Sequence, residues 1–79
     1  MDTQPVTLVV ETIHEVLDEQ GTAPVPLDVE TNILHDTPLD SMGLALVVLR
    51  LEEKTGKDPF GGGFINFHTV GELAALYAS

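Results

Sequence analysis

The chain has 79 residues, which allow one domain and a modest core, because a chain this short buries only about 60% of the surface that it exposes when unfolded. Thirteen acidic residues against three basic ones give a net charge of −10, which argues against nucleic acid and anionic lipid as partners and favours proteins with positive patches. No apolar run approaches the ~20 residues of a membrane span, and the absence of cysteine excludes disulfides and thiolate metal sites. We therefore expect a single, monomeric domain over residues 1–79, stabilised by helix packing.

The first predicted element is an amphipathic helix over residues 4–19. Its apolar residues recur at three- and four-residue spacings, which place them on one face: Val6, Val9, Val10, Ile13, Val16 and Leu17. Pro5 suits the first turn and Gly21 can end the helix. The residues before this helix lack the basic segment and apolar stretch of a signal peptide, so we expect a cytoplasmic protein.

Residues 20–39 form a long loop with three prolines and only short apolar groups. A connection of this length without secondary structure is uncommon in a compact domain. We therefore expect apolar residues of the loop to pin it to the core: Leu27, Val29, Ile33 and Leu34.

A second helix is expected over residues 41–55, with Asp40 as its N-cap and Gly56 at its end. Its apolar residues fall into two opposed stripes at 100° per residue. One stripe should face the core, namely Leu44, Val47, Val48 and Leu51. The other should face outward, namely Met42, Ala45, Leu46 and Leu49.

Three glycines at positions 61–63 precede a short expected helix near residues 63–67. A last helix over 69–78 is marked by Thr69 and Glu72 in the spacing of a capping box. The sequence thus predicts an all-α, four-helix bundle with a long first loop and a short third helix. The predicted core is Val9, Ile13, Val16, Val47, Val48, Leu51, Val70, Leu73 and Tyr77.

This order of elements, with Asp-Ser at the start of the second helix, resembles that of the acyl carrier proteins. The resemblance runs from about residue 6 to residue 77, and three segments carry it: Leu39-Asp40-Ser41-Met42-Gly43-Leu44, Leu51-Glu52-Glu53-Lys54 and Thr69-Val70-Gly71-Glu72-Leu73. It implies that a separate phosphopantetheinyl transferase attaches 4′-phosphopantetheine from coenzyme A to Ser41. It also implies two further partners, a loading ligase or synthase and a downstream acyltransferase or condensing enzyme.

The physical chemistry of the Asp-Ser segment agrees with this resemblance. A phosphodiester at a helix N-terminus meets unpaired backbone N–H groups and the positive end of the helix dipole. Asp40 would cap the helix and present an acid to the transferase or its metal. Met42 and Gly43 would shape the surface beside the attached phosphopantetheine arm. The alternative is that Asp40 and Ser41 only begin a helix, as these residue types often do.

An outward apolar stripe beside the modified serine is expected to be a docking surface. Its members are Met42, Ala45, Leu46 and Leu49, together with Arg50. The alternative is that the long first loop covers this stripe.

Two features bear on the cargo, which is the group that such a carrier would hold on its phosphopantetheine arm. Many fatty-acid carriers have several acids along this helix, whereas here they come late, at Glu52 and Glu53, which favours a specialised carrier. Residues 39–43 resemble D-alanyl carrier proteins, so an aminoacyl cargo stays open beside a fatty-acid or polyketide one. The peptidyl carriers of nonribosomal synthetases are less similar, because the paired glycines that usually precede their serine are lacking.

Catalytic and metal sites are not expected in this chain. The three histidines, His14, His35 and His68, have no ligand-like spacing. His35, Asp36, Asp40 and Ser41 include the residue types of a hydrolase triad, but no oxyanion-hole motif accompanies them. A different class of function remains, an unmodified helical module that binds one protein through the same apolar face.

Overall fold

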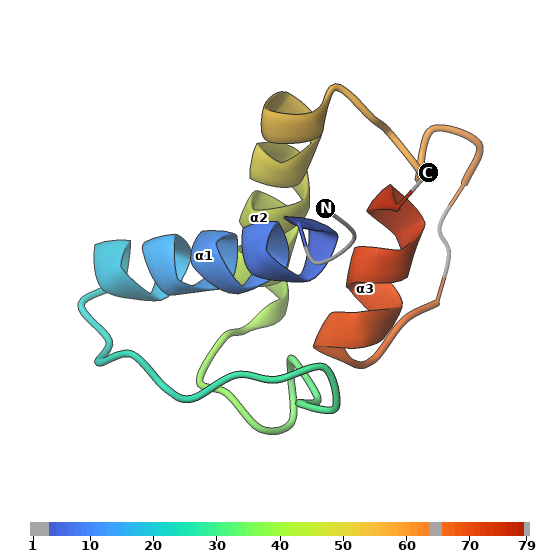
Figure 1. Cartoon of the computed structure of the whole chain (residues 1–79). Coiled ribbons are helices and arrows are strands. Elements are labelled where there is room, and N and C mark those ends of the chain that lie inside the picture. The colour runs from blue at the N-terminus through green and yellow to red at the C-terminus, as the bar shows by residue number, and fades with distance from the viewer. Residues whose placement is uncertain (1–3, 64–65, 79) are drawn as a thin grey trace.

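The computed structural model of the protein describes residues 4–63 and 66–78. These residues form three helices, α1 (Gln4–Glu19), α2 (Ser41–Thr55) and α3 (Val70–Tyr77) (Figure 1). The helices predicted over 4–19 and 41–55 are confirmed at both ends, and the one predicted over 69–78 is one residue shorter at each end. None of these helices combines the length and apolar character needed to cross a membrane.

The helix ends follow from local signals in the sequence. Asp40 caps α2, and Gly56 ends it in the left-handed conformation, with φ of 72°. At α3, Thr69 accepts a hydrogen bond from the Glu72 backbone N–H while the Glu72 carboxylate accepts one from the Thr69 backbone, which completes the expected capping box. After α1 the chain turns at Gly21, with φ of 75°.

The short helix expected near 63–67 is not present at residues 63, 66 and 67, while residues 64 and 65 lie outside the described part of the chain. The segment before them makes successive tight turns, in which Gly61 N–H donates to the Asp58 carbonyl and Gly63 N–H donates to the Phe60 carbonyl. A proline and three glycines occur between residues 59 and 63, and both residue types disfavour a helix. The four-helix expectation is therefore corrected to three helices in the described residues.

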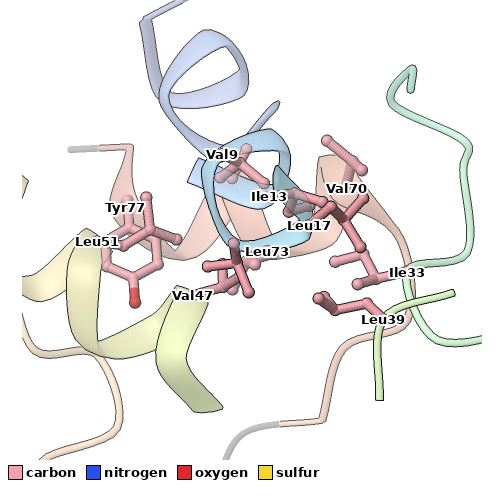
Figure 2. Packing of buried hydrophobic residues seen from close by; sticks show 12 residues of the cluster. Val9, Ile13, Leu17, Ile33, Leu39, Val47, Leu51, Val70, Leu73 and Tyr77 are labelled. Carbon is pink, nitrogen blue, oxygen red and sulfur yellow. The ribbon is translucent and has the colours of Figure 1, made fainter. Parts of the chain in front are cut away.

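The core lies along α1, which packs against both α2 and α3 (Figures 1 and 2). Its buried members come from all three helices and from the first loop: Val9, Ile13, Val16, Leu17, Ile33, Leu39, Val47, Leu51, Val70, Leu73, Ala74 and Tyr77. Eight of the nine residues that the sequence predicts for the core are among them. The ninth, Val48, is only half-buried, because it lies on a side of α2 that α1 does not cover.

The long first loop is held in place by side chains and by backbone pairing. Ile33 is 1% exposed and Leu27 is half-buried against the core, as expected, whereas Val29 and Leu34 are each 48% exposed and do not pin the loop. Backbone hydrogen bonds join the loop to the start of α3: Val70 N–H donates to the Thr31 carbonyl, Gly71 N–H to that of Val29, and Ile33 N–H to that of His68. This pairing explains how an irregular loop of such length is tolerated in a small domain.

Candidate functional site

The N-terminus of α2 is the centre of the candidate site. Asp40 is extended, and its carboxylate oxygen Oδ1 accepts a 2.7 Å hydrogen bond from the Gly43 backbone N–H. The Leu44 N–H donates to the Asp40 carbonyl at 2.9 Å, so the regular hydrogen bonds of the helix begin there. The N–H groups of Ser41 and Met42 are left without an acceptor within the described chain.

Ser41 is exposed at the first position of this helix. Its hydroxyl therefore lies beside two unpaired N–H groups and the positive end of the helix dipole. Such a helix start stabilises an anionic group attached to, or bound near, the side chain.

Gly43 has a packing role rather than the surface role that the sequence suggested. It is buried, and a Cβ atom at this position would lie 2.8 Å from Leu39 Cδ1 and 3.1 Å from Gln20 Nε2. Leu39 itself is 3% exposed and belongs to the core. Glycine thus allows the loop before α2 to pack tightly against the first turn of the helix.

The outward stripe expected on α2 is largely exposed. Met42 is 80% exposed and Leu49 is 51% exposed, and Ala45 is exposed as well, so the first loop does not cover them. Leu46 is half-buried and packs against the core. The structure therefore brings Met42, Ala45 and Leu49 together on an open surface, with Leu46 at its edge.

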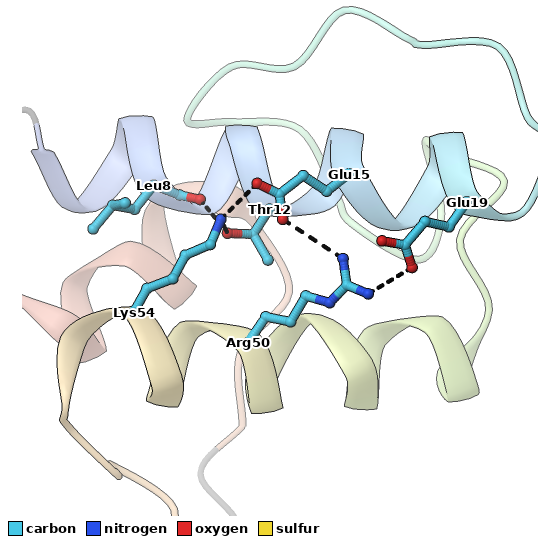
Figure 3. Close-up of polar contacts among 6 residues, drawn as sticks. All are labelled: Leu8, Thr12, Glu15, Glu19, Arg50 and Lys54. Atoms are coloured by element: carbon cyan, nitrogen blue, oxygen red, sulfur yellow. Dashed lines mark hydrogen bonds and ion pairs between the residues drawn. The ribbon is translucent and has the colours of Figure 1, made fainter.

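Arg50 faces α1 rather than this surface (Figure 3). Its guanidinium pairs with Glu19 at 2.5 Å and with Glu15 at 3.6 Å, and its side chain is 24% exposed. The hydrogen bond from Arg50 lowers the pKa of Glu19, which keeps that carboxylate ionised. One turn further on, Lys54 Nζ contacts Glu15 at 2.8 Å and the buried Thr12 hydroxyl at 3.0 Å.

These contacts leave the surface acidic. The third basic residue, Lys57, donates from Nζ to the Tyr77 carbonyl at 3.1 Å. Every lysine and arginine of the chain is therefore engaged within the molecule, although the chain has thirteen acidic residues. A partner that docks here meets apolar side chains on a molecule with a net charge of −10.

An apolar groove of about 450 Å³ opens beside Ser41. It is lined by residues of α2, the first loop and the connection between α2 and α3: Leu34, Ser41, Leu44, Ala45, Val48, Phe60 and Phe67. The rings of Phe60 and Phe67 pack at a tilt of 52°, with their centroids 5.8 Å apart.

The sequence does not predict this groove, because the apolar periodicity places Leu44 and Val48 on the side of the helix that faces the core. Both residues are half-buried. The available signal is their spacing from Ser41, since positions three, four and seven residues further along a helix lie on the same side as the starting residue.

Two of the three histidines make contacts with residues outside α2. His14 Nε2 is 2.8 Å from the Val25 carbonyl oxygen and helps to hold the first loop, while His68 Nδ1 is 3.8 Å from the Glu72 carboxylate. Within residues 4–63 and 66–78, no group of three or more histidine and acidic side chains is placed to hold a metal ion.

Comparison with known proteins identifies the family. A family model described as "Phosphopantetheine attachment site" matches residues 7–77. Searches of curated proteins and of solved structures gave no significant match. Since the matched segment takes in all but the ends of the chain, the protein belongs to the phosphopantetheine attachment site family, whose carrier domains bear 4′-phosphopantetheine as a covalently attached group.

Proposed function

We propose that the chain is an acyl carrier protein and that Ser41 is the residue to which the phosphopantetheine arm is attached. The observation that carries this proposal is the position of Ser41, exposed at the first residue of a capped helix. The side chains and N–H groups around it fit the group, because a phosphodiester on its hydroxyl lies within reach of the unpaired N–H groups of Ser41 and Met42. When bound, phosphopantetheine supplies a thiol that holds an acyl or aminoacyl group as a thioester.

The chain's own residues position and present the arm rather than react. Asp40 fixes the first turn of α2 through its bond to the Gly43 N–H, and its other carboxylate oxygen is open to a transferase or to that enzyme's metal. Among the described residues, the side chains that line the groove beside Ser41 are apolar apart from Ser41 itself. We assign to this chain the role of a carrier and leave bond-making to its partner enzymes.

Intact mass tests the attachment site. The native chain is incubated with coenzyme A and a broad-specificity phosphopantetheinyl transferase, beside Ser41→Ala and Ser79→Ala, which together cover the two serines of the chain. We expect the native chain and Ser79→Ala to gain one phosphopantetheinyl group and Ser41→Ala to gain none. Loading of Ser41→Ala would refute the assignment. Failure of all three, with a control carrier loaded in the same mixture, would leave an unmodified protein-binding module as the better description.

We further propose that Met42, Ala45 and Leu49 form the docking surface for the transferase and for the loading and downstream enzymes. The support is their exposure beside Ser41 on a surface where all basic side chains are engaged internally. Met42→Ser and Leu49→Ser should raise the KM for transferase loading while lowering the melting temperature only slightly, because Met42 is 80% and Leu49 51% exposed and serine is a weaker helix former. Ala75→Ser, on an exposed position of α3, is the matched control. An unchanged KM in both α2 variants would show that the partner docks elsewhere.

A further inference from the structure

We propose that Arg50 and Lys54 are positioning residues, which hold α2 at a rotation about its own axis that its apolar residues alone do not favour. This rotation decides which apolar side chains of α2 are presented to partner enzymes. The inference rests on the proposed docking surface and identifies the contacts between helices that orient it.

The orientation of α2 differs from the one that its apolar pattern predicts. At 100° per residue, the stripe of Leu44, Val47, Val48 and Leu51 has its centre about 50° around the helix from Val47. In the structure the buried side is instead centred on Val47, with Gly43 and Leu51 beside it. Leu44 and Val48 are only half-buried, while a glycine takes a place on the core side. The helix is therefore turned by about 50° away from the orientation that this apolar stripe favours.

Polar contacts with α1 hold α2 along the edge that lies away from the groove (Figure 3). Arg50 lies about 60° around the helix from the centre of the buried side, in the direction away from the groove. Its guanidinium pairs with Glu19 at 2.5 Å and with Glu15 at 3.6 Å, and one turn further on Lys54 Nζ pairs with Glu15 at 2.8 Å. Turning α2 toward its apolar stripe would carry both basic side chains away from α1 and break these ion pairs.

Ion pairs of this kind can choose between two orientations, although they contribute little to overall stability. The paired side chains are between 24% and 52% exposed, and each such pair shifts an equilibrium by up to about fivefold. Apolar residues occur on several sides of α2, so a small preference is enough to select one orientation. Lys54 also donates to the Thr12 hydroxyl at 3.0 Å, and Thr12 is fully buried in α1, which gives this contact a fixed partner.

Loss of these contacts should have opposite effects on two half-buried residues of α2. A turn of about 50° toward the apolar stripe would carry Val48 onto the core side and Leu46 out of its contact with the core. It would also turn Ser41 from its exposed position toward α1. Partner enzymes would then meet a different set of side chains beside the attachment residue.

Cysteine labelling detects this reciprocal change. The chain has no cysteine, so Val48→Cys and Leu46→Cys each introduce a single thiol whose alkylation rate reports its exposure. When Arg50→Glu is added, we expect slower alkylation of the Val48→Cys thiol and faster alkylation of the Leu46→Cys thiol. The ratio of the two rates should change by up to about fivefold for each of the two ion pairs lost. The labelling uses the unloaded chain, so its outcome does not depend on the transferase.

Lys57→Glu is the matched control, because it makes the same charge change at a side chain that donates to the Tyr77 carbonyl at the end of α3. It should leave the ratio of rates unchanged. Combining Arg50→Glu with Glu19→Arg restores an ion pair of reversed polarity and should return the ratio toward its native value. Arg50→Gln makes the same comparison with a smaller perturbation should Arg50→Glu fail to fold.

The kinetics of transferase loading connect the rotation to docking. Arg50→Glu should raise the KM more than Lys57→Glu, which has the same net charge, with kcat nearly unchanged in both. Faster alkylation of both thiols would indicate a loosened helix, and an unchanged ratio would show that the packing of Gly43 against Leu39 fixes the rotation. Either result would overturn the inference, and equal KM values in the two charge variants would overturn its link to docking. Failure of the native chain to load would instead count against the attachment at Ser41.

Discussion

Substituting Asp40 separates its structural role from its proposed role in loading. In Asp40→Ala, the Gly43 N–H loses its 2.7 Å acceptor, and loss of an N-cap side chain costs about 1 kcal/mol. The negative charge at the helix start contributes a further ~0.5 kcal/mol, since Asp40 is exposed. Asp40→Asn keeps an acceptor of the same shape and loses only the charge. We expect the free energy of unfolding to fall by about 1.5 kcal/mol in Asp40→Ala and by about 0.5 kcal/mol in Asp40→Asn.

Thermal unfolding followed by far-UV circular dichroism measures this difference. In a domain of this size, 1 kcal/mol corresponds to roughly 4–8 °C in melting temperature, so the alanine variant should melt about 6–12 °C lower and the asparagine variant about 2–4 °C lower. Equal losses in the two variants would refute the capping argument, because the hydrogen bond would then contribute nothing that asparagine can retain.

The same pair of variants tests the proposed contact with the transferase. At a temperature where both are folded, Asp40→Asn should load phosphopantetheine more slowly than the native chain if the carboxylate contacts the enzyme or its metal. Loading of Asp40→Asn at the native rate would leave Asp40 with the capping role alone. The attachment at Ser41 would stand in either case, because the intact-mass comparison tests it separately.

Three further predictions concern the scaffold of the site. Ile33→Ala should lower the free energy of unfolding in urea by about 2–5 kcal/mol, as for a helix core residue, whereas Val29→Ala in the same loop should change it by less than about 0.5 kcal/mol. Tyr77→Phe should raise it by about 1 kcal/mol, because the buried Tyr77 hydroxyl has no hydrogen-bond partner in the described residues, and an unchanged or lower value would contradict this. Hydrogen bonds from the His68 and Thr69 backbones lower the pKa of Glu72 from 4.5, so its stabilising contribution is present above pH 4.5 and is lost as the pH falls through the lower folded-state pKa. Glu72→Gln keeps the capping box without this titration, and its melting temperature should therefore fall less steeply in acid than that of the native chain.

The helix boundaries could be read from the sequence because their signals are local. Asp40, Gly56 and the Thr69–Glu72 pair each act within one turn of the helix that they begin or end, so no knowledge of the tertiary structure was needed. The failed prediction near residues 63–67 came from a segment with weak local signals, in which glycines and a proline outweighed the apolar residues.

The roles of the first loop could not be read in the same way, because they depend on contacts distant in the sequence. Ile33 and Val29 are both apolar residues of an irregular segment, yet only Ile33 is buried. The choice is made by backbone pairing with residues 68–71, which fixes the direction of each loop side chain. The ion pairs of Arg50 could not be predicted for the same reason, since its partners Glu15 and Glu19 lie on another helix.

The groove cannot be predicted from the sequence, because two opposed apolar stripes indicate only two environments for α2. It has at least three. Gly43, Val47 and Leu51 face the core, Met42 and Leu49 face solvent, and Leu44 and Val48 lie between them along the groove. Periodicity separates apolar from polar sides of a helix, but it does not tell a packed apolar side from one that lines an open space.

The openness of the site follows from how little chain is available to cover α2. Among the described residues, α1 packs against both other helices, whereas α2 and α3 hardly touch each other. With eight residues, α3 is only about 12 Å long, too short to cover both α1 and the length of α2. Two aromatic side chains from the connection between α2 and α3, Phe60 and Phe67, line the groove beside α2. Because α1 packs against only one side of α2, the other sides of α2 are free. Ser41, the groove and the exposed apolar surface lie on those sides.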